Sequence, residues 1–208
     1  MTGVLQTALS AEGLDLCVAT THGGHAACLV GNTRALWAPF CAWLRASPGR
    51  AELPHPLDTY VTEALARALA AAAVAPKAIH TPWESGAPDF IGLSVAAGLL
   101  WKAPCGLGIH AVHGPWVALR ALIVLDVPGD EAVPATPAPA CPHCAEGCGP
   151  RAQAMRSPAT EAEFRARWSE WAALRRACPT GGTSVYGDDQ LRYHYTRDRD
   201  LLRRLAGV

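Results

Sequence analysis

Two short apolar runs near the start of the chain flank a polar turn that contains glycine. The runs, residues 14–20 and 26–31, are rich in Val, Leu and Cys. Between them stands Thr21-His22-Gly23-Gly24-His25, and paired glycines are typical of tight turns because glycine adopts backbone angles that other residues avoid. The pattern predicts two neighbouring β-strands joined by this turn.

Two amphipathic helices are predicted to follow. Asn32 and Thr33 can cap the first helix, and Ser47-Pro48-Gly49 ends it. Pro56 and Asp58 stand in the first turn of the second helix, where a proline and an acidic side chain both favour a helix start. Apolar residues recur every three or four positions in both helices, at Leu36, Trp37, Phe40, Cys41 and Leu44 and at Tyr60, Val61, Leu65, Leu69 and Ala72.

The rest of the chain continues this mixture of strands and helices. Apolar runs predict strands over 77–81 and 117–127, and apolar spacing predicts helices over 90–101, 160–177 and 188–205. No glycine signature for phosphate binding stands between a strand and a helix, which argues against a doubly wound nucleotide-binding domain. We therefore expect the α/β (α+β) class, with a mixed sheet flanked by helices.

Composition narrows the classes of function. Of the 208 residues, 50% are hydrophobic and 17% are charged, so the chain can bury enough apolar surface to form a single domain over 1–208. The formal net charge is +0, which gives no reason to expect nucleic acid or an anionic membrane as a partner, and which leaves a homodimer open. Neither a secretory signal nor an apolar run of about 20 residues is visible, so we expect a cytoplasmic protein.

Four cysteines late in the chain form the strongest local motif. Cys141-x2-Cys144-x3-Cys148 stands in a stretch rich in Pro, Ala and Gly that predicts a surface loop, and proline follows Cys178. Four thiolates suit one iron–sulfur cluster or one tetrahedral zinc ion, and a disulfide or free thiols stay open. We expect a metal-binding insert around 128–182, with a 4Fe-4S cluster as the leading interpretation. The remaining cysteines stand singly in apolar runs and are expected in the core: Cys17, Cys28, Cys41 and Cys105.

The centre of the chain carries the most distinctive sequence. It reads Gly106-Leu107-Gly108-Ile109-His110, then Gly114-Pro115-Trp116 and Leu119-Arg120. This segment resembles the central segment of the CblC proteins, cytosolic cobalamin-processing proteins that are called MMACHC in vertebrates. The likeness extends to His55-Pro56-Leu57-Asp58, to Trp168-x-x-Trp171 and to Tyr186-x-Asp188-Asp189-Gln190-x-x-Tyr193.

The resemblance implies a nitroreductase-like fold and a bound cobalamin (vitamin B12) whose lower base is displaced from cobalt, the base-off form. CblC proteins remove the upper ligand of cobalamin, reductively for cyanide and by thiolate attack for alkyl groups. This implies an electron donor or a thiol such as glutathione as a partner, and B12-dependent enzymes downstream. Arginines hold glutathione in animal members, and those near the matching segments here are Arg175, Arg176, Arg197 and Arg199, whose forked donors suit carboxylates.

A corrin ring is a broad apolar disc rimmed with amides, so its site needs small or aromatic residues and nearby backbone polar groups. The glycines of the central segment would let the main chain approach the ring, although a glycine-rich hairpin with a core tryptophan explains the same residues without a ligand. His110 matches the family's histidine, and we expect it to hydrogen-bond to the corrin as the catalytic group. The residues assigned to the cobalamin site are Gly106, Gly108, Ile109, His110, Ala111, Val112, His113, Gly114, Pro115 and Trp116.

The central segment and the tail Ala177-Cys178-Pro179-Thr180-Gly181 also resemble epoxyqueuosine reductase, which shares the cobalamin-binding fold and adds ferredoxin-type clusters. Those enzymes carry twice as many cluster cysteines as the motif here. The leading hypothesis is a cobalamin reductase (an oxidoreductase) that releases the upper ligand, with the four-cysteine site as electron relay. Its rivals are a corrinoid-dependent reductase of an organic substrate, a non-enzymatic cobalamin chaperone with a structural zinc, and a flavin reductase with bound FMN.

Overall fold

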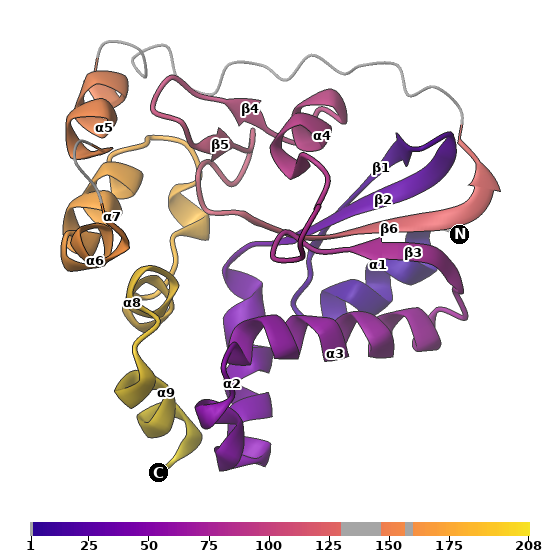
Figure 1. The fold of residues 1–208 in the computed structure, drawn as a ribbon, viewed down its shortest axis with the longest axis horizontal. Helices are drawn as coiled ribbons and strands as arrows, with labels where there is room; N and C mark the ends of the chain where they lie inside the picture. The colour runs from indigo at the N-terminus through magenta and orange to yellow at the C-terminus, as the bar shows by residue number, and fades with distance from the viewer. Residues whose placement is uncertain (1, 130–146, 157–159) are drawn as a thin grey trace.

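The computed structural model describes residues 2–129, 147–156 and 160–208. In this part of the chain the centre is a 4-stranded sheet with the strand order β1-β2-β6-β3 (Figure 1). All of its pairs are antiparallel. Helices pack on this sheet, so the expected α+β class is confirmed.

The strands follow the apolar runs of the sequence. β1 (Leu16–His22) and β2 (His25–Asn32) form the predicted hairpin, with His22 opposite His25 across the turn. β6 (Ala118–Pro128) is the long central strand and pairs with β2 on one side and with β3 (Pro76–His80) on the other. The predicted strands thus exist close to their expected bounds.

Helices cover one face of the sheet. α1 (Thr2–Ala11) and α3 (Pro56–Ala71) pack together beneath it, and α2 (Trp37–Ala46) packs beside α3 (Figure 1). The short 3-10 helices η1 (Arg34–Leu36) and η2 (Pro48–Glu52) precede and follow α2. The apolar stripes predicted for α2 and α3 face the main core, where Phe40, Leu44, Tyr60 and Val61 are fully buried.

The opposite face of the sheet is covered by α4 (Phe90–Ala96). Alternate residues of β6 point to opposite faces, as they must in a strand. Ala121 and Ile123 therefore belong to the main core, whereas Leu122 packs in a second cluster with Phe90 of α4. Because both faces of β6 are covered, its centre is an unbroken apolar run.

A second group of helices lies beyond the sheet. After α4 comes a small hairpin of β4 (Trp101–Lys102) and β5 (Gly108–Ile109). The helices that follow run past this hairpin and return to α2, against which α9 packs (Figure 1). They are α5 (Gly149–Arg156), α6 (Glu161–Ala166), α7 (Trp168–Arg176), η4 (Gly182–Ser184), α8 (Asp188–Thr196) and α9 (Arg199–Ala206). No helix in the described part of the chain is long and apolar enough to cross a membrane.

Three predicted helices were too long. The helix expected over 160–177 breaks at Arg167, and the helix expected over 188–205 breaks at Arg197, whose φ of 56° is left-handed and where Asp198 caps α9 through the Leu201 N–H (3.0 Å). The helix expected over 90–101 ends at Ala96, and Gly98 follows with φ 70°. In each case apolar spacing continued across a change of direction, which periodicity does not register. Helix α1 was not predicted.

Candidate functional site

The central glycine-rich segment folds as two consecutive tight turns. β4 and β5 pair antiparallel, with Trp101 opposite Ile109 and Lys102 opposite Gly108. The chain then reverses again over 110–114, where His110 and Gly114 exchange two backbone hydrogen bonds of 2.8 Å. The segment is therefore a compact double hairpin.

Glycine is required at position 114 for a structural reason. Its φ is 56°, and a Cβ there would overlap the backbone oxygen of Thr180. Gly181 has φ 83°, and its Cβ would overlap the backbone oxygen of His113 in the same way. The two glycines thus let two stretches of main chain touch, which ties the 110–114 turn to the loop after α7.

The imidazole of His110 is held in one tautomer. Its Nδ1 accepts hydrogen bonds from the backbone N–H groups of Val112 (3.1 Å) and His113 (3.2 Å). Burial lowers the pKa of His110, and the nearby His113 lowers it further, so the neutral ring is favoured. Since Nδ1 accepts, the single proton of the neutral ring lies on Nε2, which is then a hydrogen-bond donor.

His113 joins the same turn to the C-terminal part of the chain. Its ring lies against that of His110, with the centroids 4.7 Å apart and the planes tilted by 32°. Its Nδ1 lies 2.7 Å from the hydroxyl of Ser184 in η4. The sequence offered no partner for His113, because Ser184 is distant along the chain.

Trp116 is a buried core residue, and the side chain of Arg175 packs against its ring. Trp116 is 1% exposed, and the guanidinium of Arg175 lies 4.9 Å from the Trp116 ring and 4.8 Å from that of Tyr186. Arg175 is itself buried and donates two hydrogen bonds to the backbone oxygen of Pro115 (2.8 and 2.5 Å). The Trp116 ring therefore offers no open wall to a ligand here, and the Arg175 guanidinium is engaged within the protein.

Strand β5 separates two cavities. Leu107 and Ile109 line one of them, and Gly108, which stands between these two residues in the sequence, lines the other. We call the second the apolar cleft; it has a volume of about 340 Å³. It lies between α4, the start of β6 and α8, and its lining residues are Pro82, Phe90, Ile91, Leu100, Gly108, Val117, Ala118, Leu119 and His194.

His194 of α8 is the ionisable residue of the apolar cleft. Burial lowers its pKa well below the usual value, and the positive charges of Arg175, Arg120 and Arg197 add to this effect. Its ring meets that of Tyr186 edge-on, with the centroids 6.0 Å apart. His194 is therefore a neutral imidazole at the wall of an otherwise apolar space.

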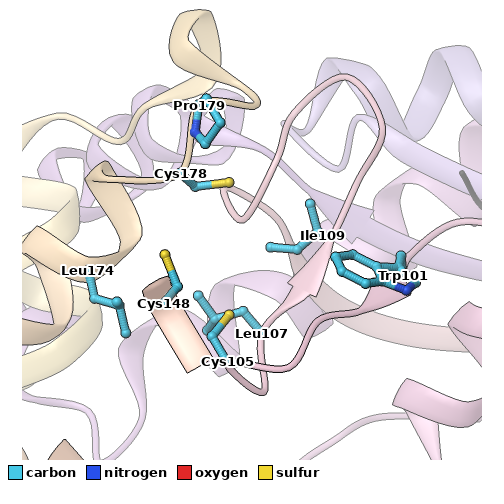
Figure 2. A pocket seen from close by; sticks show the side chains of 8 residues that line it. All are labelled: Trp101, Cys105, Leu107, Ile109, Cys148, Leu174, Cys178 and Pro179. Carbon is cyan, nitrogen blue, oxygen red and sulfur yellow. The ribbon is translucent and has the colours of Figure 1, made fainter. Parts of the chain in front are cut away.

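We call the first cavity the thiol pocket because three cysteines line it. Cys105 comes from the β4–β5 turn, Cys148 stands just before α5, and Cys178 follows α7 (Figure 2). The cavity volume is about 20 Å³, which is room for about one water molecule. The other lining residues are apolar: Trp101, Leu107, Ile109, Leu174 and Pro179.

Two of the four predicted metal ligands lie in the described part of the chain. Cys148 and Cys178, far apart in the sequence, line the same pocket, while Cys141 and Cys144 lie outside the described residues. Among the residues that the structure describes, no three His, Cys, Asp or Glu side chains are arranged to hold a metal ion. Of the cysteines expected in the core, Cys28 is buried in the main core, Cys17 packs against that core, and Cys41 of α2 is buried at 6% exposure.

The four arginines expected to bind a thiol do not form one group. Arg197 and Arg199 line a cavity of about 490 Å³ together with Arg165 and Asp58, which we call the arginine cleft. Arg199 there donates to three backbone oxygens, at Ala51, Leu53 and Pro54. Arg175 is buried elsewhere, and Arg176 forms an exposed ion pair with Asp188 (2.7 Å).

These features define the class of the protein: an antiparallel α+β domain with a ligand-sized apolar cleft beside the start of its central strand. A solved structure with this architecture is that of CblC from C. elegans, described as a B12-trafficking protein and a human MMACHC homologue; the TM-score is 0.67 at 14% sequence identity. The match covers 98% of this chain and 86% of that chain. No family model and no curated protein matches the sequence. The chain has a CblC-like fold, as the resemblance implied.

Sequence reasoning missed the far wall of the apolar cleft and one side of the thiol pocket. His194, Phe90 and Leu100 reach the cleft from segments that showed only helical spacing. Cys105 was expected in the core, and it is 3% exposed, yet it also lines the thiol pocket. Only the three-dimensional contacts bring these residues to the central segment.

Proposed function

We propose that this chain binds cobalamin at the apolar cleft, in the base-off form, and removes its upper axial ligand by reduction. The observation that carries the proposal is the apolar cleft itself, which lies beside the CblC-like central segment within a CblC-like fold. Its volume of about 340 Å³ suits part of one face of the corrin ring, so the rest of the cofactor would lie outside the cleft. We place the activity in the cytoplasm.

The lining of the apolar cleft fits one face of a corrin ring in chemical type. Gly108 and Ala118 are small and leave room for a flat group, and Phe90 and Leu119 provide apolar contact area. The neutral His194 adds one polar group to this wall. Bound cobalamin would supply the cobalt at which the upper ligand is exchanged.

The tautomer of His110 supports a hydrogen-bonding role. Because its Nδ1 is occupied by two backbone N–H groups, its Nε2 carries the proton and has no lone pair to offer cobalt. The Nε2–H would donate to a carbonyl or phosphate oxygen at the rim of the ligand. In this role His110 would hold the rim of the ligand and would not ligate cobalt.

The thiol pocket and the arginine cleft supply the second half of the proposal. The thiol pocket shares β5 with the apolar cleft, so a metal centre held by Cys148 and Cys178, with Cys141 and Cys144, would stand on the other side of one strand from the corrin. An iron–sulfur cluster there would pass single electrons. Arg197 and Arg199 of the arginine cleft would hold the carboxylates of a thiol such as glutathione for removal of alkyl groups.

The test is an anaerobic absorption titration of the purified full chain with hydroxocobalamin and cyanocobalamin, before and after a reductant is added. We expect the base-off spectrum at saturation, and loss of cyanide from cyanocobalamin after reduction. A corrin spectrum that does not change at saturating protein contradicts cobalamin binding. A base-off spectrum without release of cyanide contradicts the reductive activity and favours a cobalamin chaperone.

A further inference from the structure

Another cavity borders the arginine cleft at the start of α3. It has a volume of about 460 Å³ and lies between the first two turns of α3 and the segment 81–89, which joins β3 to α4. We call it the acidic cavity, and its lining residues are His55, Asp58, Thr59, Thr62, Glu63 and Trp83. His55 and Asp58 also line the arginine cleft, so the two cavities meet at these residues.

Most polar side chains of the acidic cavity are hydrogen-bond acceptors. The hydroxyl groups of Thr59 and Thr62 donate their hydrogens to the backbone oxygens of His55 (3.0 Å) and Asp58 (3.0 Å), so their oxygens keep lone pairs for another donor. Asp58 and Glu63 add two carboxylates. These groups are complementary to a ligand group that donates several hydrogen bonds and carries a positive charge.

Trp83 makes an organic ammonium group the best match. This side chain lines the acidic cavity and is 40% exposed. The face of a tryptophan ring attracts a nearby cation through its quadrupole, and ammonium groups are bound in this way. Carboxylates and a tryptophan around one cavity therefore favour an ammonium group as occupant.

The charges on the two sides of the border are opposite and are not paired with each other. Asp58 and Arg197 both line the arginine cleft, yet neither forms an ion pair with another residue that the structure describes. Arg199 differs, because it donates to three backbone oxygens. The cleft thus presents one carboxylate and one guanidinium to a ligand that carries both charges.

We propose that the arginine cleft and the acidic cavity together bind a thiol that carries an α-amino acid group, with its carboxylate at Arg197 and its ammonium at Asp58. In such a group the carboxylate and the ammonium are attached to one carbon atom, so both can lie at the border of the two cavities. The inference rests on the proposed function, which assigns a thiol such as glutathione to the arginine cleft. It adds that Asp58 selects thiols with an ammonium group over thiols with a carboxylate alone.

The first experiment needs no variant. Binding of S-methylglutathione and of its N-acetyl derivative to the full chain is measured by isothermal titration calorimetry at neutral pH, without cobalamin. The two ligands have the same carboxylates, but acetylation removes the positive charge of the amino group. We expect the free amine to bind about tenfold more tightly, because it gains a partly exposed ion pair and a contact with the Trp83 ring.

Variants then assign this preference to residues. Asp58→Asn and Trp83→Leu should each reduce the tenfold preference to about threefold or less, mainly by weakening the amine form. Arg197→Ala should weaken both ligands, because both keep their carboxylates. Asp188→Asn is the matched control for Asp58→Asn, since Asp188 also stands in the first turn of a helix but lines neither cavity, and it should keep the full preference. Circular dichroism shows whether each variant is folded.

The outcomes separate this inference from the proposed function. If the unmodified chain binds both ligands equally well, Asp58 does not hold an ammonium group and the inference is wrong, while the arginine cleft remains a thiol site. A preference that Asp58→Asn leaves intact also overturns it. If neither ligand binds, the thiol site of the proposed function fails and this inference fails with it. The cobalamin titration is independent of these measurements, so its failure would be recognised separately.

Discussion

Replacing Arg175 by Ala is expected to destabilise the fold strongly, because this residue holds the central segment onto the C-terminal helices. The side chain is 4% exposed and donates two hydrogen bonds to the Pro115 oxygen (2.8 and 2.5 Å). Its guanidinium also lies between the rings of Trp116 and Tyr186, 4.9 and 4.8 Å from their centroids. Truncation removes these contacts together and leaves a carbonyl oxygen without its donor.

The magnitude follows from these contacts. A hydrogen bond to a charged group contributes about 1.5–3 kcal/mol, and an acceptor that loses its only buried donor costs about 1–3 kcal/mol. Each desolvated cation–π contact adds about 0.5–2 kcal/mol. Because these terms overlap, we expect Arg175→Ala to lower the free energy of unfolding by about 3–5 kcal/mol.

The neighbouring residue provides a matched control. Arg176 forms one ion pair with Asp188, and the two side chains are 47% and 94% exposed, so Arg176→Ala should change the free energy of unfolding by about 0–1 kcal/mol. Urea denaturation of both variants, followed by circular dichroism and tryptophan fluorescence, measures the difference. Equal stability of the two variants would refute the structural role of Arg175. It would favour the anion-binding role that the sequence suggested.

Gly114, His194 and Arg197 each give a further prediction. Gly114→Ala should destabilise the chain by about 2 kcal/mol or more in urea denaturation, because its φ is 56° and the added methyl group meets Thr180; a change below about 0.5 kcal/mol would contradict this packing. Burial holds the pKa of His194 well below the usual value of 6.5. The unfolded chain therefore binds more protons than the folded chain below about pH 6.5. The free energy of unfolding should accordingly fall as the pH is lowered from about 7 to 5. His194→Gln should reduce this dependence, and an unchanged pH profile would show that the side chain is not the titrating group. Arg197→Ala should raise the glutathione concentration needed for half-maximal removal of an alkyl group by about tenfold, whereas Arg176→Ala should not; equal values would exclude the arginine cleft as the thiol site.

Much of the fold could be predicted because it depends on local patterns. The β1–β2 hairpin has paired glycines between two apolar runs, and α2 and α3 carry continuous apolar stripes that become the main core. The breaks within the C-terminal helices could not be predicted. Arg197 adopts a left-handed conformation that arginine does not favour, and the turn is followed by the Asp198 cap of α9 and by the packing of α9 against α2, which apolar spacing does not register.

The candidate site could be located but not assembled from the sequence. The motif of 106–116 borders the apolar cleft at Gly108, yet several of its residues have structural tasks: Gly114 contacts Thr180, and Trp116 lies in the core beneath Arg175. The walls of the apolar cleft and of the thiol pocket come from residues distant in sequence, such as His194 and Cys105. Contacts of this range leave no periodic signal in a single chain.

The most direct test of the central claim is to fill the apolar cleft and measure cobalamin binding. Ala118→Phe places a large side chain at the start of β6, where Ala118 lines the cleft, and Val127→Phe places the same side chain at the exposed far end of the strand. In anaerobic titrations with hydroxocobalamin, Ala118→Phe should raise the dissociation constant by about tenfold or more, and Val127→Phe should leave it unchanged. Equal affinities and equal base-off spectra for the two variants would show that the corrin ring does not occupy the cleft.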